Sequence, residues 1–367
     1  MGRDATHSMK IGLVRRGYSP SGGAERYLLR FADALRAAGH EAMLFCSAEW
    51  PQDVWQGELV RVPGRGPREF SDGLRNAWPR DECDIVFSLE RVRDCDAYRA
   101  GDGVHRAWLD RRRAFEPAWK SWFRERQAKH REILDLERAV FQAGGNRLII
   151  ANSRMVAAEI GRHYKTPLDR LTVIYNGLPA RPAMPHLRAP ARARLGLADG
   201  ECAILFAGSG WERKGLRFAI QAAGLAKAPA TLLIAGEGKR HGLPRSDRAR
   251  FLGNIADMGE LMEAADLFLL PTIYDPFSNA SLEAMAAGLP VITTTANGFS
   301  EIMRPGLDGE ALHSPADIDG IAAAIDKWSA CETPDSRRVR RIEAARYSIE
   351  ENVRATLAAL FNLKNAG

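Results

Sequence analysis

The chain has 367 residues, of which 46% are hydrophobic, and a formal net charge of +6. Its length predicts two globular domains of about 150 to 200 residues each. Five scattered cysteines without a C-x-x-C pair argue against a disulfide framework or a zinc site, and they favour a reducing compartment. No apolar stretch reaches the roughly 18 to 20 residues that span a bilayer. We therefore expect a cytoplasmic protein without a signal peptide, in which Met1 to Ser8 are a vector remnant outside the fold.

The first half begins with an apolar strand at residues 10–14, a loop containing Gly22 and Gly23, and a helix whose apolar residues recur at helical spacing. A second strand at 41–46 completes a β-loop-α-β unit, which implies a parallel sheet. The other elements expected in this half are strands at 59–62, 84–88, 148–151 and 171–175 and one long surface helix at 118–143.

The second half repeats this architecture. The elements expected there are strands at 202–207, 231–235, 250–252, 266–270 and 291–293 and a helix at 216–226. A break near 176–179 predicts domains at 9–178 and 179–348, with a terminal helix at 349–363 that packs back on the first. The fold class is therefore α/β, with two Rossmann-like doubly wound domains and a ligand cleft between them.

Two carboxylates, Asp275 and Glu283, lie between the strands at 266–270 and 291–293. Asp275 falls in a turn and Glu283 in the short helix that follows. Loops at the carboxyl ends of parallel strands face the ligand crevice, so these carboxylates could hold two parts of a hydroxyl-rich ligand. The alternative is that Asp275 caps a turn and Glu283 complements the helix dipole.

A glycine-rich basic loop, Gly208 to Gly215, joins the first strand of this half to a helix. Backbone N–H groups at a helix start attract an anion, and Arg213 and Lys214 would neutralise its charge, so the loop suits a diphosphate. Its spacing is not that of a P-loop NTPase. The alternative is a solvated basic turn.

The run from Asp275 to Ile292 resembles the E-x7-E region of retaining nucleotide-sugar glycosyltransferases of family 4, with Asp in place of the first Glu. Residues 294–301 are similar to the N-G-x-x-E segment that follows in many of these enzymes. The resemblance implies that Glu283 binds ribose hydroxyls and that Asp275 lies against the donor sugar. It also implies that backbone N–H groups hold sugar hydroxyls or phosphate; these belong to Phe277, Ser278 and Asn279.

The resemblance extends to the first half. Gly22 and Gly23 stand where family members carry a G-G loop that faces the donor diphosphate. The run from Arg99 to His105 resembles an A-D-G segment of lipopolysaccharide-core glucosyltransferases, in which the Asp lies on the acceptor side. Asp102 is thus a candidate catalytic residue and His105 a secondary, acceptor-side one. The alternative is a turn carboxylate beside an incidental imidazole.

From Arg106 to Arg131 the chain has nine Lys or Arg and three Asp or Glu, interleaved with aromatic residues. Cations attract anionic head groups and Trp prefers the membrane boundary, so we expect an anionic membrane surface or glycolipid partner here. The alternative is a solvated helix whose aromatic residues cover the core. No nucleic-acid-binding module accompanies the stretch, so nucleic acid is not an expected partner. Asp94 and Asp96 match the D-x-D metal motif of another fold, and we do not expect them to bind a metal.

Residues 9–363 thus resemble a family-4 glycosyltransferase of the GT-B fold. The resemblance implies metal-independent, retaining transfer of a hexose from a nucleotide diphosphate sugar, with UDP favoured. It implies a cell-envelope glycolipid or lipopolysaccharide-type acceptor at the inner face of the cytoplasmic membrane, and no cofactor. Arg213 and Lys214 would stabilise the leaving diphosphate, with residues 253–255 beside the base. The alternatives are a sugar-nucleotide epimerase or hydrolase and a non-catalytic binding protein; an oxidoreductase ranks lower because G-x-G-x-x-G is missing after the first strand.

Overall fold

A computed structural model of the chain describes residues 8–20, 22–77, 82–125, 127–142, 146–255, 257–330 and 333–365. The chain forms two compact units. Unit 1 consists of residues 1–179 and 349–367, and unit 2 of residues 180–348.

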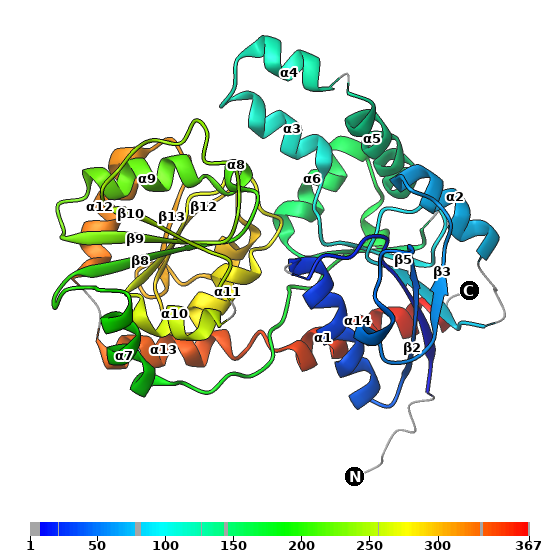
Figure 1. Cartoon of the computed structure of the whole chain (residues 1–367). Coiled ribbons are helices and arrows are strands. Elements are labelled where there is room, and N and C mark those ends of the chain that lie inside the picture. Colours follow the sequence, from blue (N-terminus) through cyan, green and yellow to red (C-terminus); the bar gives the residue numbers. More distant parts are fainter. Residues whose placement is uncertain are drawn as a thin grey trace. The chain divides into compact units, whose positions relative to one another are not determined.

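Unit 1 is built on a seven-stranded parallel sheet with the order β3-β2-β1-β4-β5-β6-β7 (Figure 1). Ile11 of β1 pairs with Ala42 of β2 on one side and with Ile85 of β4 on the other. The strands are β1 (Lys10–Val14), β2 (Glu41–Cys46), β3 (Leu59–Arg61), β4 (Ile85–Ser88), β5 (Ala97–Ala100), β6 (Leu148–Ala151) and β7 (Leu171–Val173).

Helices cover this sheet, and the last helix of the chain lies beside the first (Figure 1). Apolar side chains of both helices, among them Phe31 and Leu357, are buried in one core, and the Tyr27 hydroxyl donates a hydrogen bond to Asn352 Oδ1 at 2.7 Å. The helices are α1 (Gly23–Ala37), α2 (Pro67–Ala77), α3 (His105–Arg113), α4 (Ala118–Glu125), α5 (Ala128–Phe141), α6 (Arg154–Tyr164) and α14 (Ile349–Asn365), with 3₁₀ turns η1 (Gln52–Val54) and η2 (Leu168–Arg170).

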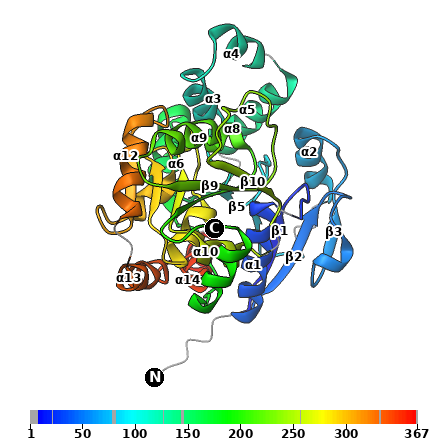
Figure 2. The same cartoon turned by 60° about the vertical axis from the view of Figure 1, so that its left-hand side comes forward.

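Unit 2 has a six-stranded parallel sheet with the order β10-β9-β8-β11-β12-β13. Its strands are β8 (Cys202–Ala207), β9 (Ala230–Ala235), β10 (Ala249–Gly253), β11 (Leu267–Leu270), β12 (Val291–Thr294) and β13 (Gly309–Leu312). Helices α9 (Leu216–Leu225) and α12 (Ile318–Ser329) cover one face, and α10 (Met258–Ala264) and α11 (Asn279–Ala286) the other (Figures 1 and 2). The remaining helices are α7 (Arg188–Arg194), α8 (Trp211–Lys214) and α13 (Pro334–Ala344), with 3₁₀ turns η3 (Pro185–Leu187) and η4 (Gly298–Ile302).

Two parallel sheets covered by helices confirm the predicted α/β class. In each sheet the strand order reverses beside the first strand, between β1 and β4 in unit 1 and between β8 and β11 in unit 2. In open parallel sheets, ligands bind outside the carboxyl ends of the strands at such a point. The fold thus marks one candidate position in each unit.

The structure corrects one sequence-based expectation and adds two strands. The single helix expected at 118–143 is wrong, because α4 ends at Glu125 and α5 begins after Gln127, whose extended backbone (φ −61°, ψ 135°) interrupts the helix. Strands β5 and β13 were not predicted. Within the described part of the chain, no helix combines the length and apolar composition needed to cross a membrane.

Candidate functional site

In unit 2 the basic loop after β8 is fastened to the segment that follows β11. The carbonyl oxygen of Arg213 accepts hydrogen bonds from Ile273 N at 2.9 Å and from Thr272 Oγ1 at 2.8 Å. Gly215, at φ +76°, permits this approach, because a Cβ there would lie 1.9 Å from the Pro271 oxygen. The two segments that flank the reversal of strand order are therefore held together by backbone contacts.

This contact brings two predicted site residues together. Lys214 Nζ lies 2.7 Å from Asp275 Oδ2, and the two side chains are 14% and 6% exposed. Lys214 is the last residue of the single turn α8, which the sequence analysis did not predict, and α9 begins directly after Gly215. The Arg213 side chain is half-buried in the same turn, with no hydrogen bond or ion pair among the described residues.

Asn297, which the sequence analysis did not single out, fixes the acidic loop. Its side chain is fully buried; Oδ1 accepts hydrogen bonds from Ser278 N (3.2 Å) and Phe299 N (3.1 Å), and Nδ2 donates one to Thr293 Oγ1 (3.0 Å). Asp275 forms a parallel bridge with Asn297. The N-G motif in the sequence marks this residue, but its contacts come from three separate segments.

The turn before α11 carries the other predicted donor-binding residues. Phe277 and Ser278 are buried, and Asn279 and Glu283 are half-buried on α11. Ser278 Oγ caps the helix by accepting from Ser281 N at 3.2 Å. The Ser278 N–H, which was expected to contact a sugar or phosphate, instead donates to Asn297. Its role in this structure is to hold the loop in place.

Unit 1 has a cluster of acidic and basic side chains at the carboxyl ends of β1, β4 and β5. Arg15 follows β1 and lies 3.1 Å from Glu25, 3.5 Å from Glu90 and 3.6 Å from Asp102. Burial tends to lower the pKa of Arg15, but Asp102 and the two glutamates outweigh it and raise that pKa. Asp102 is the accessible member of this group, with 44% of its side chain exposed.

A second arginine extends the cluster. Arg91 lies 3.7 Å from Asp102 and 3.3 Å from Glu137, which is fully buried, and it donates to the Gly103 carbonyl at 2.8 Å. Asp102 is therefore held between two arginines. Sequence reasoning identified Asp102 but missed Arg15 and Arg91, because they follow different strands far apart in the chain.

The two glycines predicted to face the donor lie at the start of α1. Gly22 is the N-cap, and a Cβ there would lie 1.7 Å from Glu25 Oε2, so this glycine makes room for the carboxylate that pairs with Arg15. A Cβ at Gly23 would meet nothing within 4 Å among the described residues.

His105 begins α3 and is engaged within unit 1. Its ring stacks on His130 with centroids 5.0 Å apart, and His105 Nε2 lies 2.9 Å from His130 Nδ1. Burial and the nearby Arg91 lower the pKa of His105 to about 3, so the imidazole is neutral at physiological pH. Its backbone N–H donates to Glu137. The candidate acceptor-side imidazole is thus part of a hydrogen-bonded pair between α3 and α5.

The two carboxylates of the D-x-D match contact other residues of unit 1. Asp94 pairs with Arg75 at 2.7 Å, and Asp96 accepts a hydrogen bond from Val86 N at 2.8 Å. Among the described residues, no three His, Cys, Asp or Glu side chains come together as a metal site.

Many of the cations between residues 106 and 131 are neutralised by acidic neighbours. Arg111 pairs with Glu159 at 2.8 Å, and Arg113 pairs with Asp110 at 3.1 Å. Arg112 and Arg124 both contact Glu116, at 3.3 and 3.1 Å.

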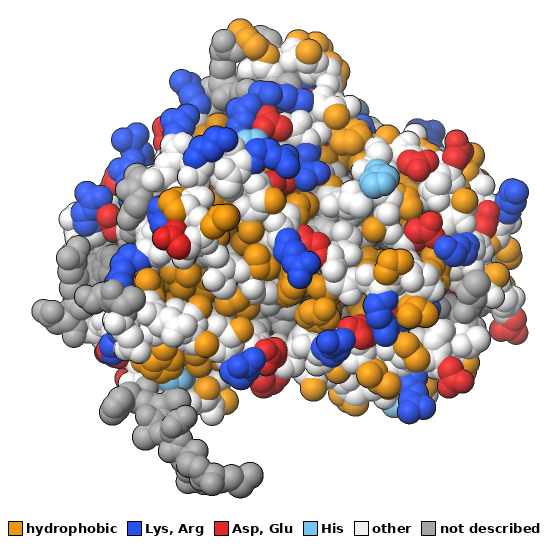
Figure 3. All heavy atoms as spheres, turned by 180° about the vertical axis from the view of Figure 1, so that it is seen from behind, with side chains coloured by type: hydrophobic (Ala, Val, Ile, Leu, Met, Phe, Trp, Pro, Cys, Tyr) orange, Lys and Arg blue, Asp and Glu red, His pale blue; other side chains and the backbone are white. Residues whose placement is uncertain are grey.

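Two tryptophans on α4 are exposed, Trp119 by 62% and Trp122 by 53%, and the exposed Lys120 lies over the Trp119 ring. Lys129 and Arg131 on α5 are also exposed. Lys and Arg side chains lie near hydrophobic ones over this end of unit 1 (Figure 3). The side chain of Phe123 lies outside the described residues.

Comparison with known proteins identifies the relatives of this chain. The family described as "Glycosyl transferases group 1" matches residues 201–330. The chain is 32% identical to the glycogen synthase of Mycobacterium tuberculosis, over 92% of this chain and 89% of that protein. It is 26% identical to the lipopolysaccharide glucosyltransferase WaaG of Escherichia coli (strain K12), over 84% of this chain and 87% of that protein.

Solved structures match over almost the whole chain. The crystal structure of WaaG superposes with a TM-score of 0.74 at 22% identity and covers 92% of this chain and 95% of its own. Anabaena Alr3699/HepE in complex with UDP and glucose gives a TM-score of 0.72 at 18% identity and covers 96% and 100%. The chain therefore belongs to the group 1 glycosyltransferases and has their GT-B fold of two parallel-sheet α/β domains.

Proposed function

We propose that this glycosyltransferase is a retaining, metal-independent enzyme of family 4. In this proposal it transfers a hexose from a UDP-sugar to a cell-envelope glycolipid or lipopolysaccharide-type acceptor. The observation that carries the proposal is the part-buried Lys214–Asp275 pair at the reversal of strand order in unit 2, with Glu283 on the next helix. Ligands bind at this position in doubly wound sheets.

The relatives favour this substrate class. WaaG is named as a lipopolysaccharide glucosyltransferase, and HepE has been solved in complex with UDP-glucose. Glu283 would hold the ribose hydroxyls, and Asp275, fixed by Lys214, would lie against the donor sugar. The backbone around Phe277 and Asn279 would orient that sugar.

The chemical step needs negative charge to be stabilised on the leaving diphosphate. As the bond from the anomeric carbon to the phosphate oxygen breaks, the half-buried Arg213 and Lys214 supply fixed positive charge beside the basic loop. The acceptor oxygen bonds to the anomeric carbon on the same face, and its proton passes to the leaving phosphate. Asp102, held by Arg15 and Arg91, would orient the acceptor hydroxyl, with His105 nearby in unit 1.

We further propose that the enzyme works at the inner face of the cytoplasmic membrane. The exposed Trp119 and Trp122, with Lys120 beside them, suit the boundary between lipid head groups and acyl chains.

A donor screen tests the central proposal. UDP- and GDP-sugars are added to the protein in EDTA, and thermal shift and release of nucleoside diphosphate are measured. We expect one UDP-hexose to raise Tm and to be hydrolysed slowly, and Glu283→Gln to abolish most of this shift relative to the ligand-free variant. No shift with any donor would contradict the assignment. Rapid donor consumption without an acceptor would favour the hydrolase or epimerase, and binding without turnover a non-catalytic protein.

A further inference from the structure

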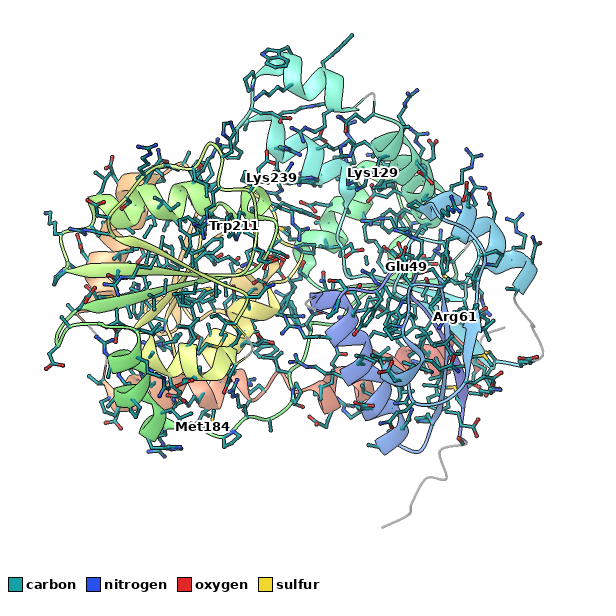
Figure 4. All side chains as sticks on the ribbon, viewed as in Figure 1. Glu49, Arg61, Lys129, Met184, Trp211 and Lys239 are labelled. Carbon is teal, nitrogen blue, oxygen red and sulfur yellow. The ribbon has the colours of Figure 1, made fainter. Side chains whose placement is uncertain are left out.

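Trp211, labelled in Figure 4, joins three separate strand ends in unit 2. It is the first residue of α8, and its side chain is buried. Its indole Nε1 donates a hydrogen bond to the Gly208 carbonyl at 3.1 Å, in the loop after β8. Its ring packs against Phe251 of β10 with centroids 5.5 Å apart. After β9, a Cβ at Gly238 would lie 2.6 Å from Trp211 Cδ2, so that loop passes directly against the ring.

The backbone of the same strand ends is also connected. Gly208 N donates to the Ala235 carbonyl at 3.0 Å, and Gly236 N donates to the Gly253 carbonyl at 2.7 Å. Beyond Phe251, the guanidinium of Arg240 lies 4.3 Å over the ring and continues the stack towards solvent. The Trp211 side chain therefore packs between the loop after β8, the loop after β9 and the end of β10.

The bond to Gly208 has a consequence for the amide that follows. In a planar trans peptide the C=O and N–H groups point in opposite directions. Because the Gly208 carbonyl is directed at the indole, the Ser209 N–H is directed away from it. Ser209 is exposed, and its N–H has no hydrogen-bond acceptor among the described residues. Such an amide can donate to a phosphate oxygen.

We propose that Trp211 is a positioning residue for the donor diphosphate: it fixes the Gly208–Ser209 peptide so that the Ser209 N–H faces a phosphate oxygen. This inference rests on the proposed donor site. Trp211 does not touch the reacting atoms in this proposal. Its indole N–H, and not only its ring, contributes to binding of the diphosphate.

Trp211→Phe tests the proposal, because it removes the N–H donor and keeps an aromatic ring. We expect the Kd for UDP, measured by calorimetry, to rise about fivefold, which is the loss of one hydrogen bond. The affinity for uridine, measured by competition, should stay within twofold of wild type, because uridine has no phosphate. Trp211→Leu should raise the Kd for UDP further, and KM should rise more than kcat falls.

Trp328→Phe is the matched control. Trp328 is a buried tryptophan of the same unit, on α12, whose indole N–H also has a partner, Glu310 at 3.4 Å. It should change Tm without changing the Kd for UDP. A Trp211→Phe protein with the wild-type Kd for UDP would overturn the inference, as would an equal loss for uridine and UDP. A wild-type protein that binds no nucleoside diphosphate would overturn the donor site itself and the role of Trp211 with it.

Discussion

The Lys214–Asp275 pair shows what single residues contribute to this site. Taken separately, Lys214 was expected to neutralise a diphosphate and Asp275 to contact a sugar; the structure adds that each compensates the other's buried charge. Removing one partner of a buried ion pair leaves an uncompensated charge and costs roughly 3–5 kcal/mol. A loss of activity after a single substitution would therefore mix lost chemistry with lost stability.

A double-mutant cycle separates the two effects. We expect Lys214→Met and Asp275→Asn each to lower the free energy of unfolding of unit 2 by a few kcal/mol, and the double variant to recover most of it. All three variants should transfer sugar at least about tenfold more slowly, because a fixed positive charge or a sugar contact is lost. Urea unfolding and a transfer assay provide the measurements.

Lys327→Met provides the control for this cycle. Lys327 pairs with Glu310 at 2.9 Å in the same unit, but both side chains are well exposed. Its loss should cost less than about 1 kcal/mol and leave transfer unchanged. A stable double variant with wild-type transfer would remove Lys214 and Asp275 from the site.

At the scale of elements, eleven of the thirteen strands that the structure describes were predicted from their short apolar runs, and β5 and β13 were not. Strand β5 has the sequence A-Y-R-A, and Arg99 at its centre argues against a buried strand. In the structure Arg99 is buried, donates to Asn176 and lies 4.4 Å over the Tyr27 ring. These partners are far away in the sequence, so the pattern of hydrophobic residues does not reveal them.

The same distinction holds for the sites. The candidate site residues of unit 2 lie in two runs, so motif spacing was enough to single them out. The cluster around Asp102 gathers side chains that follow β1, β4 and β5, together with Glu25 of α1 and Glu137 of α5. Only the order of strands in the sheet brings them to one edge, and that order was not predicted from the sequence.

The His105–His130 pair links α3 to α5 and predicts a pH dependence of stability. Burial and Arg91 lower the pKa of His105 to about 3, and burial, with the cations Arg124, Arg112 and Lys129, lowers that of His130. Below about pH 6.5 the unfolded chain therefore binds more protons than the folded one, so stability is full above this pH and falls as the solution becomes more acidic.

We expect the free energy of unfolding to fall by up to about 1.4 kcal/mol per pH unit for His105 alone, between about pH 6.5 and pH 4. His105→Gln should remove this part of the slope, as measured by urea unfolding at a series of pH values. His163→Gln, which removes an imidazole of the same unit outside the pair, controls for the loss of one histidine. Equal slopes for wild type and His105→Gln would contradict the prediction.

At the scale of the whole molecule, the distribution of charge matters more than the net charge of +6. The arginines at 111, 112 and 113 belong to the basic stretch for which the sequence predicted an anionic partner, but each has an acidic neighbour within the protein. Neutralising them would break ion pairs, including one to the buried Glu159. The exposed cations of α4 and α5 are a better test of membrane binding; these are Lys120, Lys129 and Arg131.

We expect the triple variant Lys120→Gln, Lys129→Gln and Arg131→Gln to bind vesicles that contain phosphatidylglycerol more weakly, by about fivefold for each charge that lies at the surface. Co-sedimentation at two salt concentrations measures this, and the variant should also lose salt dependence, because exposed charges are screened. Trp119→Ser with Trp122→Ser should weaken binding at both salt concentrations, because it removes the apolar contribution.

A control triple variant, Arg26→Gln, Arg162→Gln and Lys165→Gln, removes the same charge from exposed positions elsewhere in unit 1. If both triple variants lost the same affinity, the effect would be explained by net charge alone. If the Lys120, Lys129 and Arg131 variant sedimented like wild type, the membrane-binding surface would lie elsewhere on the enzyme.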